Sequence, residues 1–556
     1  MKIDSEDEKL NKVLHYHQQT KHNFHHSAEG PGYLDWKNQP DPFRRYHGSP
    51  LISLAVDTDI ESPFYDSLYY PDSNLAQPFN SQTISCFLRH SMALSAWKQA
   101  GESRWALRVN PSSGNLHPTE AYLLLPALDN ISSTPMIAHY APKEHVLEKR
   151  CGLADSLWQC LTEDFNEPIL FMGLSSIYWR ESWKYGSRAY RYCHLDIGHA
   201  LAAISLSAAS LGWHCQVLEN LSHDQIRMLI GLPDDDHNNN ETEQADCLIA
   251  ITQKNSKHPI LSLPDQVIQQ IALSDWQGEA SILSSGSISW DAIDTVAIAC
   301  KKPATDLAEL GKVITQEKTV QHYYSTLKAH PLIRQRRSAV AMDRQTTIQA
   351  EQFYHLLSRL LPEQVETPFK LFISSTSIQL IFFVHRVDGI KPGVYCLIRD
   401  PETLSELKLL MNEEFVWKKI KTCSEKLPLF CLVEGDARSL SQQLSCQQEI
   451  AADGCFSLVM LSRFEKPLQK TGAWLYPQLY WECGMIGQIL YLEAEAMNIQ
   501  GTGIGCFFDD PVHEFLGLKD MSFQILYHFT IGGAVHDDRI LTLPAYNVST
   551  LRTDNS

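Results

Sequence analysis

Apolar and polar positions along the chain form short periodic segments that predict a mixture of helices and strands. Residues 81–125 have a helical apolar pattern, then the polar turn PSSGN at 111–115, then the apolar run AYLLL, which is typical of a strand. PILFMGL at 168–174 predicts another strand. The Ala-rich apolar stretch at 193–212 predicts a long helix that ends at Gly212, as at a helix C-cap.

Two less regular regions divide this pattern. Residues 1–80 are rich in His, Tyr and Pro with little apolar periodicity, so they predict an extended N-terminal arm that wraps around the rest of the chain. A mixed stretch predicts a connecting segment at 255–316, which leaves two domains, at 81–254 and 317–548. The His-rich run at 15–26 could hold a metal, but its spacing is not that of ligands on a regular element, and we favour the wrapping segment.

The second part of the chain resembles the first at an offset of 286 residues. Over residues 184–232, compared without a gap, the identities exceed what chance predicts, and they include glycines and charged residues. They pair Lys184 with Lys470, Gly186 with Gly472, Tyr190 with Tyr476, Gly198 with Gly484, Leu206 with Leu492, Ala208 with Ala494, Asp224 with Asp510, and Gly231-Leu232 with Gly517-Leu518. The repeat predicts two halves of one fold that pack about a pseudo-twofold axis, like an isologous dimer.

Composition narrows the class of protein. The 556 residues suffice for two or more domains, with a hydrophobic share of 44%, typical of a globular chain. A net charge of −18 argues against nucleic acid as a partner, because phosphate backbones are bound by clustered Lys and Arg. Apolar runs are too short for a membrane span and the N-terminus is too polar for a secretory signal, so we expect a cytoplasmic protein. The fourteen cysteines are dispersed without a C-x-x-C pair, which predicts no metal site.

A basic cluster at 333–338 combines Arg334, Arg336 and Arg337 with Ser338. Guanidinium groups offer paired hydrogen bonds to a phosphate, and the hydroxyl adds a neutral donor. On an acidic chain this cluster suits a phosphate site, although a solvated basic turn has the same pattern.

Glycines recur in GTGIGCFFDD at 501–510, where Gly503, Ile504 and Gly505 follow the repeated helix. Glycines let backbone N–H groups approach a phosphate or flavin closely, and they also occur in tight turns. The equivalent stretch of the first half, at 215–224, has no glycine. The two halves are therefore expected to differ at this place.

Two segments of the first half carry other polar groups. The loop at 111–115 presents hydroxyls and an amide that could hydrogen-bond a polar ring system, or simply form a turn. Lys184 and Tyr185 could act as base and acid if burial lowers the pKa of the lysine, whereas a charged amphipathic turn is the plainer reading.

Motifs in both halves resemble the nitroreductase superfamily, and within it the SagB-type dehydrogenases, which include azoline oxidases. In the first half the resemblance rests on NPSSGNLHPTEAY and KYGSRAYRYCHLDIGHA, and in the second on RQRRS, ECGMIGQ, GTGIGCFFDD and YHFTIGGAVHDDRI. It implies an α+β fold of two nitroreductase-like domains fused as a pseudo-dimer, each a mixed sheet flanked by helices. In that superfamily each FMN lies at the subunit interface and takes contacts from both subunits.

The resemblance also implies which residues bind FMN. Arg336, Arg337, Ser338 and Arg539 are expected to hold the flavin phosphate and ribityl chain, with Gly503, Ile504 and Gly505 beside the cofactor. The family's flavin-contacting P-S-x-x-N loop corresponds to Pro111, Ser112, Ser113, Gly114 and Asn115. The first half lacks R-R-S and the second lacks P-S-x-x-N, so one composite site is expected instead of two. Val340 stands where family members often carry Lys or Arg.

Lys184 and Tyr185 match the Lys-Tyr pair of the azoline oxidases, which implies proton removal from the substrate while hydride leaves to the flavin. The expected activity is that of an FMN-dependent dehydrogenase acting on a small molecule or a peptide, with Lys184 as base and Tyr185 assisting. Two alternatives stay open: an NAD(P)H-dependent reductase of nitro compounds or quinones, and a non-catalytic flavoprotein-like scaffold for peptide modification. The fused pair could itself dimerise.

Overall fold

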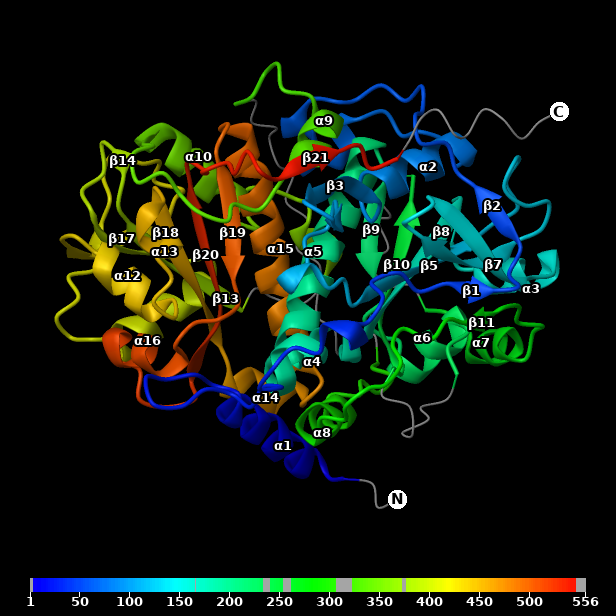
Figure 1. Cartoon of the computed structure of the whole chain (residues 1–556), viewed down its shortest axis with the longest axis horizontal. Helices are drawn as coiled ribbons and strands as arrows, with labels where there is room; N and C mark the ends of the chain where they lie inside the picture. The colour runs from blue at the N-terminus through cyan, green and yellow to red at the C-terminus, as the bar shows by residue number, and fades with distance from the viewer. Residues whose placement is uncertain are drawn as a thin grey trace.

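The computed structural model shows two halves lying side by side, each built on a seven-stranded sheet covered by helices (Figure 1). The residues described are 4–165, 167–233, 241–253, 262–306, 323–372 and 377–546. This arrangement confirms the expected fold of two α and β halves in tandem.

The first sheet has the strand order β2-β7-β6-β5-β8-β10-β9, with antiparallel neighbours. Its elements are β2 (Leu51–Ser53), β5 (Thr119–Leu125), β6 (Met136–Ala141), β7 (Val146–Gly152), β8 (Ile169–Ile177), β9 (His214–Val217) and β10 (Glu243–Thr252), with helices α3 (Asp155–Leu161), α5 (Ala189–Ser210), α6 (His223–Ile230) and α7 (Asp265–Ala272). Leu123 of the central β5 shares a core with α5, whereas Leu124 shares another with α6 and α7. Because helices cover both faces, this strand is apolar at most positions instead of alternating.

The second sheet has the order β16-β17-β15-β13-β18-β20-β19, again antiparallel. Its elements are β13 (Ile378–Val384), β15 (Gly393–Leu397), β16 (Lys418–Lys419), β17 (Leu429–Glu434), β18 (Phe456–Arg463), β19 (Gln500–Ile504) and β20 (Phe523–Gly532), with helices α10 (Ala350–Arg359), α11 (Leu404–Leu410), α15 (Leu475–Ala496) and α16 (Asp509–Leu516). Phe382 of the central β13 shares a core with α10 and α15, and Phe383 shares one with α11 and α16. An isolated parallel bridge joins Ser338, which lies outside the strands of this sheet, to Gly501 at the β19 edge.

The sequence repeat is also a structural repeat. Helix α15 begins and ends 286 residues after α5, and α16 begins and ends 286 residues after α6. Strand β19 likewise starts 286 residues after β9. The shared offset therefore extends over a helix, a strand and a second helix, and the two halves have the same fold in this region.

The two long helices cross at a pair of equivalent glycines. A Cβ atom on Gly198 of α5 would lie 2.2 Å from the carbonyl oxygen of Trp481, and one on Gly484 of α15 would lie 2.2 Å from that of Leu195. Trp481 lies 286 residues after Leu195, so the two glycines make equivalent contacts. This reciprocity is that of an isologous contact, so a pseudo-twofold axis passes between the glycines, as predicted.

The N-terminal arm is more regular than its composition predicts. It begins with helix α1 (Glu6–Gln19), which Ser5 and Glu8 cap reciprocally, and it supplies β2 to the edge of the first sheet. In α1 the buried His17 ring lies 3.2 Å from the Tyr476 hydroxyl and 3.1 Å from the Gln524 side chain. These contacts with the second half stabilise α1. Tertiary contacts of this kind cannot be seen in the local periodicity of the sequence.

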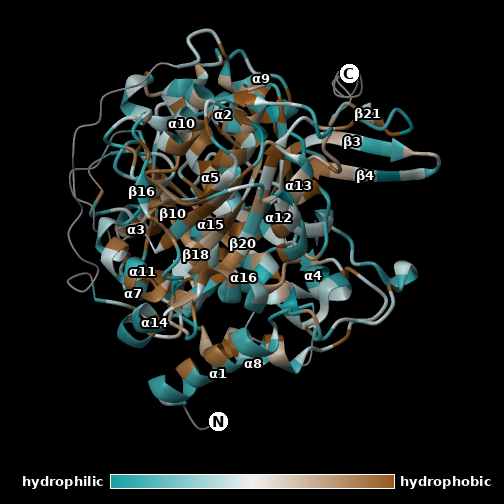
Figure 2. Cartoon of the chain, turned by 90° about the vertical axis from the view of Figure 1, so that its left-hand side faces the viewer, coloured by the Kyte–Doolittle hydropathy of each residue, from teal (hydrophilic) through white to brown (hydrophobic). Residues whose placement is uncertain are grey.

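The connecting segment folds onto the first half. Strand β11 (Glu279–Ala280) pairs with β1 (Tyr46–His47), and α8 (Asp291–Ala299) packs in the core that contains part of α1. The C-terminal strand β21 (Leu541–Leu543) instead crosses to the first half, where it pairs with β3 (Leu94–Ala100). Figure 2 shows β3 and β4 (Ser103–Arg108) projecting from the body with β21 beside them.

The other helices lie around these sheets. They include α2 (Ser81–Arg89), α4 (Tyr178–Tyr185), α9 (Ala329–Gln335), α12 (Arg438–Leu444), α13 (Ile450–Asp453) and α14 (Glu465–Thr471), with short 3-10 turns η1 (Trp36–Asn38), η2 (Tyr65–Tyr69), η3 (Pro71–Ser73), η4 (Ser113–Asn115), η5 (Gly186–Arg188), η7 (Phe369–Leu371) and η8 (Pro401–Thr403), and a parallel strand pair β12 (Ile348–Gln349) and β14 (Val387–Asp388). Of the helices in the described ranges, none combines the length and apolarity of a membrane span.

Candidate active site

The basic cluster and the glycine run of the second half lie side by side. After α9 ends, the chain becomes extended, and Ser338 bridges to Gly501 of β19. The Ser338 hydroxyl donates to the Tyr491 hydroxyl at 3.0 Å, and the Gly503 N–H donates to the same oxygen at 3.1 Å. Tyr491, on α15, therefore joins two of the predicted cofactor segments.

Arg336 reaches from the second half into the first. Its side chain is buried, and its Nη2 donates to the carbonyl oxygens of Arg108 at 3.0 Å and Val109 at 3.3 Å. Its Nε is buried and has no hydrogen-bond partner among the described residues. Burial lowers the pKa of this guanidinium. The residue is thus not part of a solvated turn, and its contacts lie just before the loop at 111–115.

Arg337 is anchored in both halves. Its backbone N–H donates to the Glu495 carboxylate at 2.9 Å, and its guanidinium donates to the Ser95 hydroxyl of the first half at 3.4 Å. Burial, and then the charge of Arg336, lower the pKa of the Arg337 guanidinium to about 10. Guanidinium groups on two adjacent residues favour a bound anion.

The loop of the first half packs against the Lys-Tyr pair. Ser113 donates from its N–H, at 3.0 Å, and from its hydroxyl, at 3.1 Å, to the Asp196 carboxylate on α5. Gly114 has a φ of +58°, and a Cβ there would lie 2.5 Å from the Tyr185 hydroxyl and 3.1 Å from the Lys184 Nζ. Glycine is therefore required both by the backbone and by these side chains. Two segments that are some 70 residues apart in sequence share one site.

The side chains of Asn115 and Ser112 form hydrogen bonds with backbone groups on either side of the loop. The Asn115 amide donates to the Ala106 carbonyl at 2.7 Å, and the His117 N–H donates to the Ser112 hydroxyl at 2.8 Å. Pro111 is partly exposed at the start of the loop. These bonds hold the loop in one conformation and leave its backbone facing the Lys-Tyr pair.

A row of side chains joins the Lys-Tyr pair to the second half. Lys184 Nζ lies 5.2 Å from the centre of the Tyr185 ring, which meets the Tyr192 ring edge-on at 4.7 Å. The Tyr192 hydroxyl donates to the Gly505 carbonyl at 3.1 Å. Burial, and then the nearby Glu181, raise the pKa of Tyr185, so this phenol stays protonated.

Sequence reasoning missed two buried acids beside this pair. Burial raises the pKa of Asp196 to about 7 and, together with the Asp196 charge, raises that of Glu181 well above its usual value. The Ser112 hydroxyl lies 3.5 Å from one Glu181 carboxylate oxygen, and the other has no hydrogen-bond partner among the described residues. The available signals were an Asp inside an apolar helix and a Glu one helical turn before Lys184.

The glycines of the second half make room for tyrosines. A Cβ on Gly503 would lie 1.7 Å from the Tyr527 hydroxyl, and one on Gly505 would lie 2.7 Å from the Tyr192 ring. Ile504 between them is buried. We expected a phosphate or flavin to approach the backbone of this glycine run closely, and in the structure aromatic side chains make that approach.

Arg539 lies apart from these residues. Its side chain is 88% exposed, and its guanidinium pairs with the neighbouring Asp537 at 2.7 Å. Val340 is also exposed, at 76%. The expected phosphate contact of Arg539 stays a prediction.

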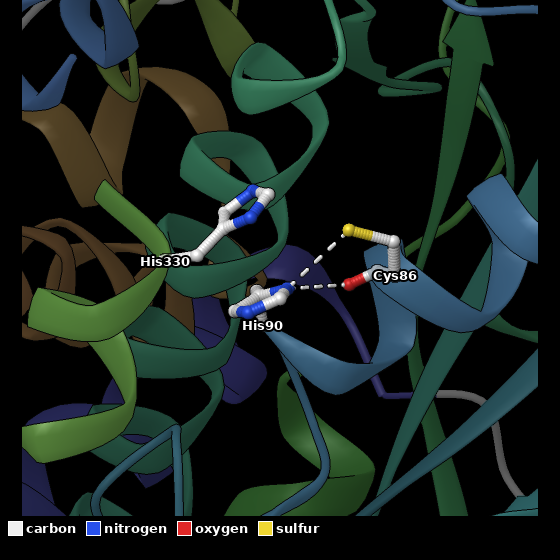
Figure 3. Close-up of side chains that lie close together, drawn as sticks. All are labelled: Cys86, His90 and His330. Atoms are coloured by element: carbon white, nitrogen blue, oxygen red, sulfur yellow. Dashed lines mark hydrogen bonds between the residues drawn. The ribbon is translucent and has the colours of Figure 1, made fainter. Parts of the chain in front are cut away.

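Three metal-ligand side chains meet elsewhere, although the cysteine spacing predicted no metal site. Cys86 and His90 of the first half and His330 of α9 are all buried, and Figure 3 shows the two rings face to face beside the thiol. The His90 Nδ1 donates to the Cys86 carbonyl at 2.8 Å, and His330 bonds to the Ser210 hydroxyl at 3.1 Å. Burial lowers the pKa of His330 to about 4 and raises that of Cys86 to about 11. These groups are neutral at pH 7 and engaged with the protein.

Comparison with protein families matches a family model described as "Nitroreductase family" to residues 97–239 and 333–533. The two segments fall in the two halves and together span more than half of the chain. Comparison with curated proteins gives no match.

The solved structures that this chain resembles are distant from it in sequence. A protein described as a nitroreductase from Anabaena variabilis has a TM-score of 0.67 at 20% identity, over 94% of this chain and 99% of that one. A second such protein, from Ralstonia eutropha, matches at 15% identity with a TM-score of 0.27, over 39% of this chain and 95% of that one. The Escherichia coli microcin synthetase McbBCD complex with truncated pro-MccB17 bound matches at 18% identity with a TM-score of 0.28, over 42% and 84%. The first match covers both halves, so it shows the tandem fold.

Proposed function

Because the chain belongs to the nitroreductase family, whose members are generally FMN-dependent oxidoreductases, we propose that it is an FMN-dependent oxidoreductase with one composite flavin site between its halves. The observation that carries this proposal is the contact of Arg336 with the carbonyl oxygens of Arg108 and Val109. It brings the basic cluster of the second half to the strand that leads into the 111–115 loop of the first.

The donor set fits the phosphate of FMN. Arg336 and Arg337 supply two adjacent guanidinium groups and Ser338 a hydroxyl, and the buried Nε of Arg336 is a donor without a partner among the described residues. A buried donor of this kind is costly unless a ligand satisfies it. The loop at 111–115 would lie beside the ring system, next to the Lys-Tyr pair.

We assign the reaction to the SagB type, with Lys184 as the base. Bound FMN would supply the two-electron redox chemistry. Lys184 Nζ removes a proton from the substrate carbon, and the Tyr185 phenol, which its partly buried position keeps protonated, orients the substrate. Asp196 and Ser113, which it bonds, hold this wall of the site in place. A small molecule or a peptide that carries an azoline ring is the substrate class that this assignment requires.

The flavin content of the purified chain tests the composite site. Heat-released flavin should amount to one FMN per chain, and Arg336→Ala should lower this amount. Two FMN per chain would contradict the composite site, and a chain that neither carries nor binds FMN would overturn the proposal.

A second assay tests the direction of hydride transfer separately from flavin binding. With a thiazoline-containing peptide under anaerobic conditions, the bound flavin should be bleached by the wild type and not by Lys184→Ala. Bleaching by NAD(P)H alone, equal in both proteins, would instead favour a reductase of nitro compounds or quinones. FMN binding with neither reaction would favour a scaffold role.

A further inference from the structure

Two cysteines from separate segments of the second half meet at the surface. The thiol of Cys506, after β19, lies 2.8 Å from the Sγ of Cys446, after α12. Cys506 is exposed and Cys446 is partly buried. Closing this distance to a disulfide bond of about 2.05 Å requires a movement of less than about 1 Å.

The two segments are tied together on both sides of the thiols. The Phe508 N–H donates to the Leu444 carbonyl at 2.9 Å, and the Gln448 side chain donates to the Cys506 carbonyl at 2.9 Å. Cys446 itself has a φ of +53°, a backbone conformation that non-glycine residues rarely adopt. Strain of this kind persists only where the surrounding structure determines it, so the thiols are held opposite one another.

The charges around the pair favour one thiolate. The hydrogen bond from Cys446 and, after the opposing effect of burial, the nearby guanidinium of Arg188 lower the pKa of the Cys506 thiol to about 7. The same interaction raises the pKa of Cys446, which keeps its proton. A partly exposed low-pKa thiolate beside a second thiol is the arrangement that reacts with oxidants.

We propose that Cys446 and Cys506 form a redox-active dithiol, which peroxide oxidises to an intramolecular disulfide. The Cys506 thiolate attacks one oxygen of hydrogen peroxide, the O–O bond breaks, and a sulfenic acid and hydroxide form. The Cys446 sulfur then attacks the sulfenic sulfur, the S–S bond forms as the S–O bond breaks, and the hydroxyl leaves with the Cys446 proton as water. In total the two thiols lose two electrons and two protons, and peroxide becomes two molecules of water.

The pair lies close to the candidate active site. Cys506 directly follows Gly505, whose carbonyl accepts the Tyr192 hydroxyl, and its charge acts on the Tyr185 phenol. A disulfide would therefore stiffen the wall of the site that contains these tyrosines. The inference itself does not rest on flavin chemistry and can be tested without a substrate.

The test uses the full-length chain, reduced and then treated with hydrogen peroxide under native conditions. Free thiols are alkylated after denaturation without reductant, and the peptides are mapped by mass spectrometry. A cross-linked peptide pair that contains Cys446 and Cys506 is expected, and reductant should reverse it. Cys160→Ser, which removes another exposed thiol, should give the same product.

Two variants make the result specific. Cys446→Ser should stop the reaction at a sulfenic acid on Cys506, trapped by dimedone, and Cys506→Ser should leave Cys446 reduced. In the wild type, alkylation of Cys506 by iodoacetamide should reach half its maximal rate near pH 7, and at a higher pH in Cys446→Ala, which removes the hydrogen-bond donor. Recovery of both thiols in alkylated form after oxidation of the native protein would overturn the proposal. So would the same cross-link forming equally fast in urea-unfolded protein, because the fold would then have no part in it.

Discussion

Replacing Asp196 by Asn should flatten one part of the pH dependence of stability. The carboxylate is buried and accepts two hydrogen bonds from Ser113. Burial raises its pKa from an ordinary value of 3.8 to about 7, against the lowering effect of these bonds and of Ser112. The folded protein therefore holds the proton more tightly than the unfolded chain does. This stabilisation is complete below pH 3.8 and is lost as the pH rises through about 7.

The size of the effect follows from the shift. One pKa unit corresponds to about 1.4 kcal/mol, so the wild type should lose about 3 kcal/mol from this group between pH 5 and 8. The amide of the Asp196→Asn variant does not titrate in this range, so the variant should lose nothing. At about 2.1 cal/mol/K of unfolding entropy per residue, a chain of this length changes its Tm by about 2 to 3 °C for that free energy.

Thermal unfolding at pH 5, 6, 7 and 8 measures this change in stability. The Tm of Asp196→Asn minus that of the wild type should rise by about 2 to 3 °C from pH 5 to 8. Asp155→Asn, which removes an exposed acid, is the matched control and should run parallel to the wild type. If the Asp196→Asn profile is also parallel, Asp196 is already ionised at pH 5 and the reasoning from burial is refuted.

Other residues give separate tests. Arg336→Ala should weaken FMN binding by about 10-fold to 100-fold, since a charge-assisted hydrogen bond contributes about 1.5 to 3 kcal/mol. Replacement of the exposed Arg539 by Ala should change FMN binding little. Fluorescence titration of the flavin-free chain with FMN compares the two variants. Lys184→Ala should keep FMN and lose at least about 100-fold in the rate of flavin bleaching by a thiazoline peptide, and a matching loss of FMN would contradict a role as base. Gly484→Ala should cost about 1 to 3 kcal/mol, seen as a lower Tm, because its Cβ would strike the opposite helix, whereas Gly30→Ala, with open space around it, should leave the Tm unchanged.

Local patterns were enough for the elements that depend on nearby residues. The long apolar helix predicted at 193–212 is the C-terminal part of α5, and the strand predicted at 168–174 lies mostly within β8. The repeat predicted the pseudo-twofold contact, since equal sequences that fold alike present the same face to one another. The arm was predicted less well, because α1 is stabilised by aromatic residues of the second half that its own periodicity does not record.

The features of the candidate site likewise divide into those that the sequence predicted and those that only the tertiary structure shows. The sequence by itself determined which segments carry donors, glycines and a Lys-Tyr pair, because residue type and spacing are local properties. Only the tertiary structure decided that Arg336 meets Arg108, that Asp196 is buried beside Ser113, and that Cys446 faces Cys506. These contacts join residues 60 to 228 positions apart, and the proton affinities that follow from them depend on burial by the packed halves, which no single segment contains.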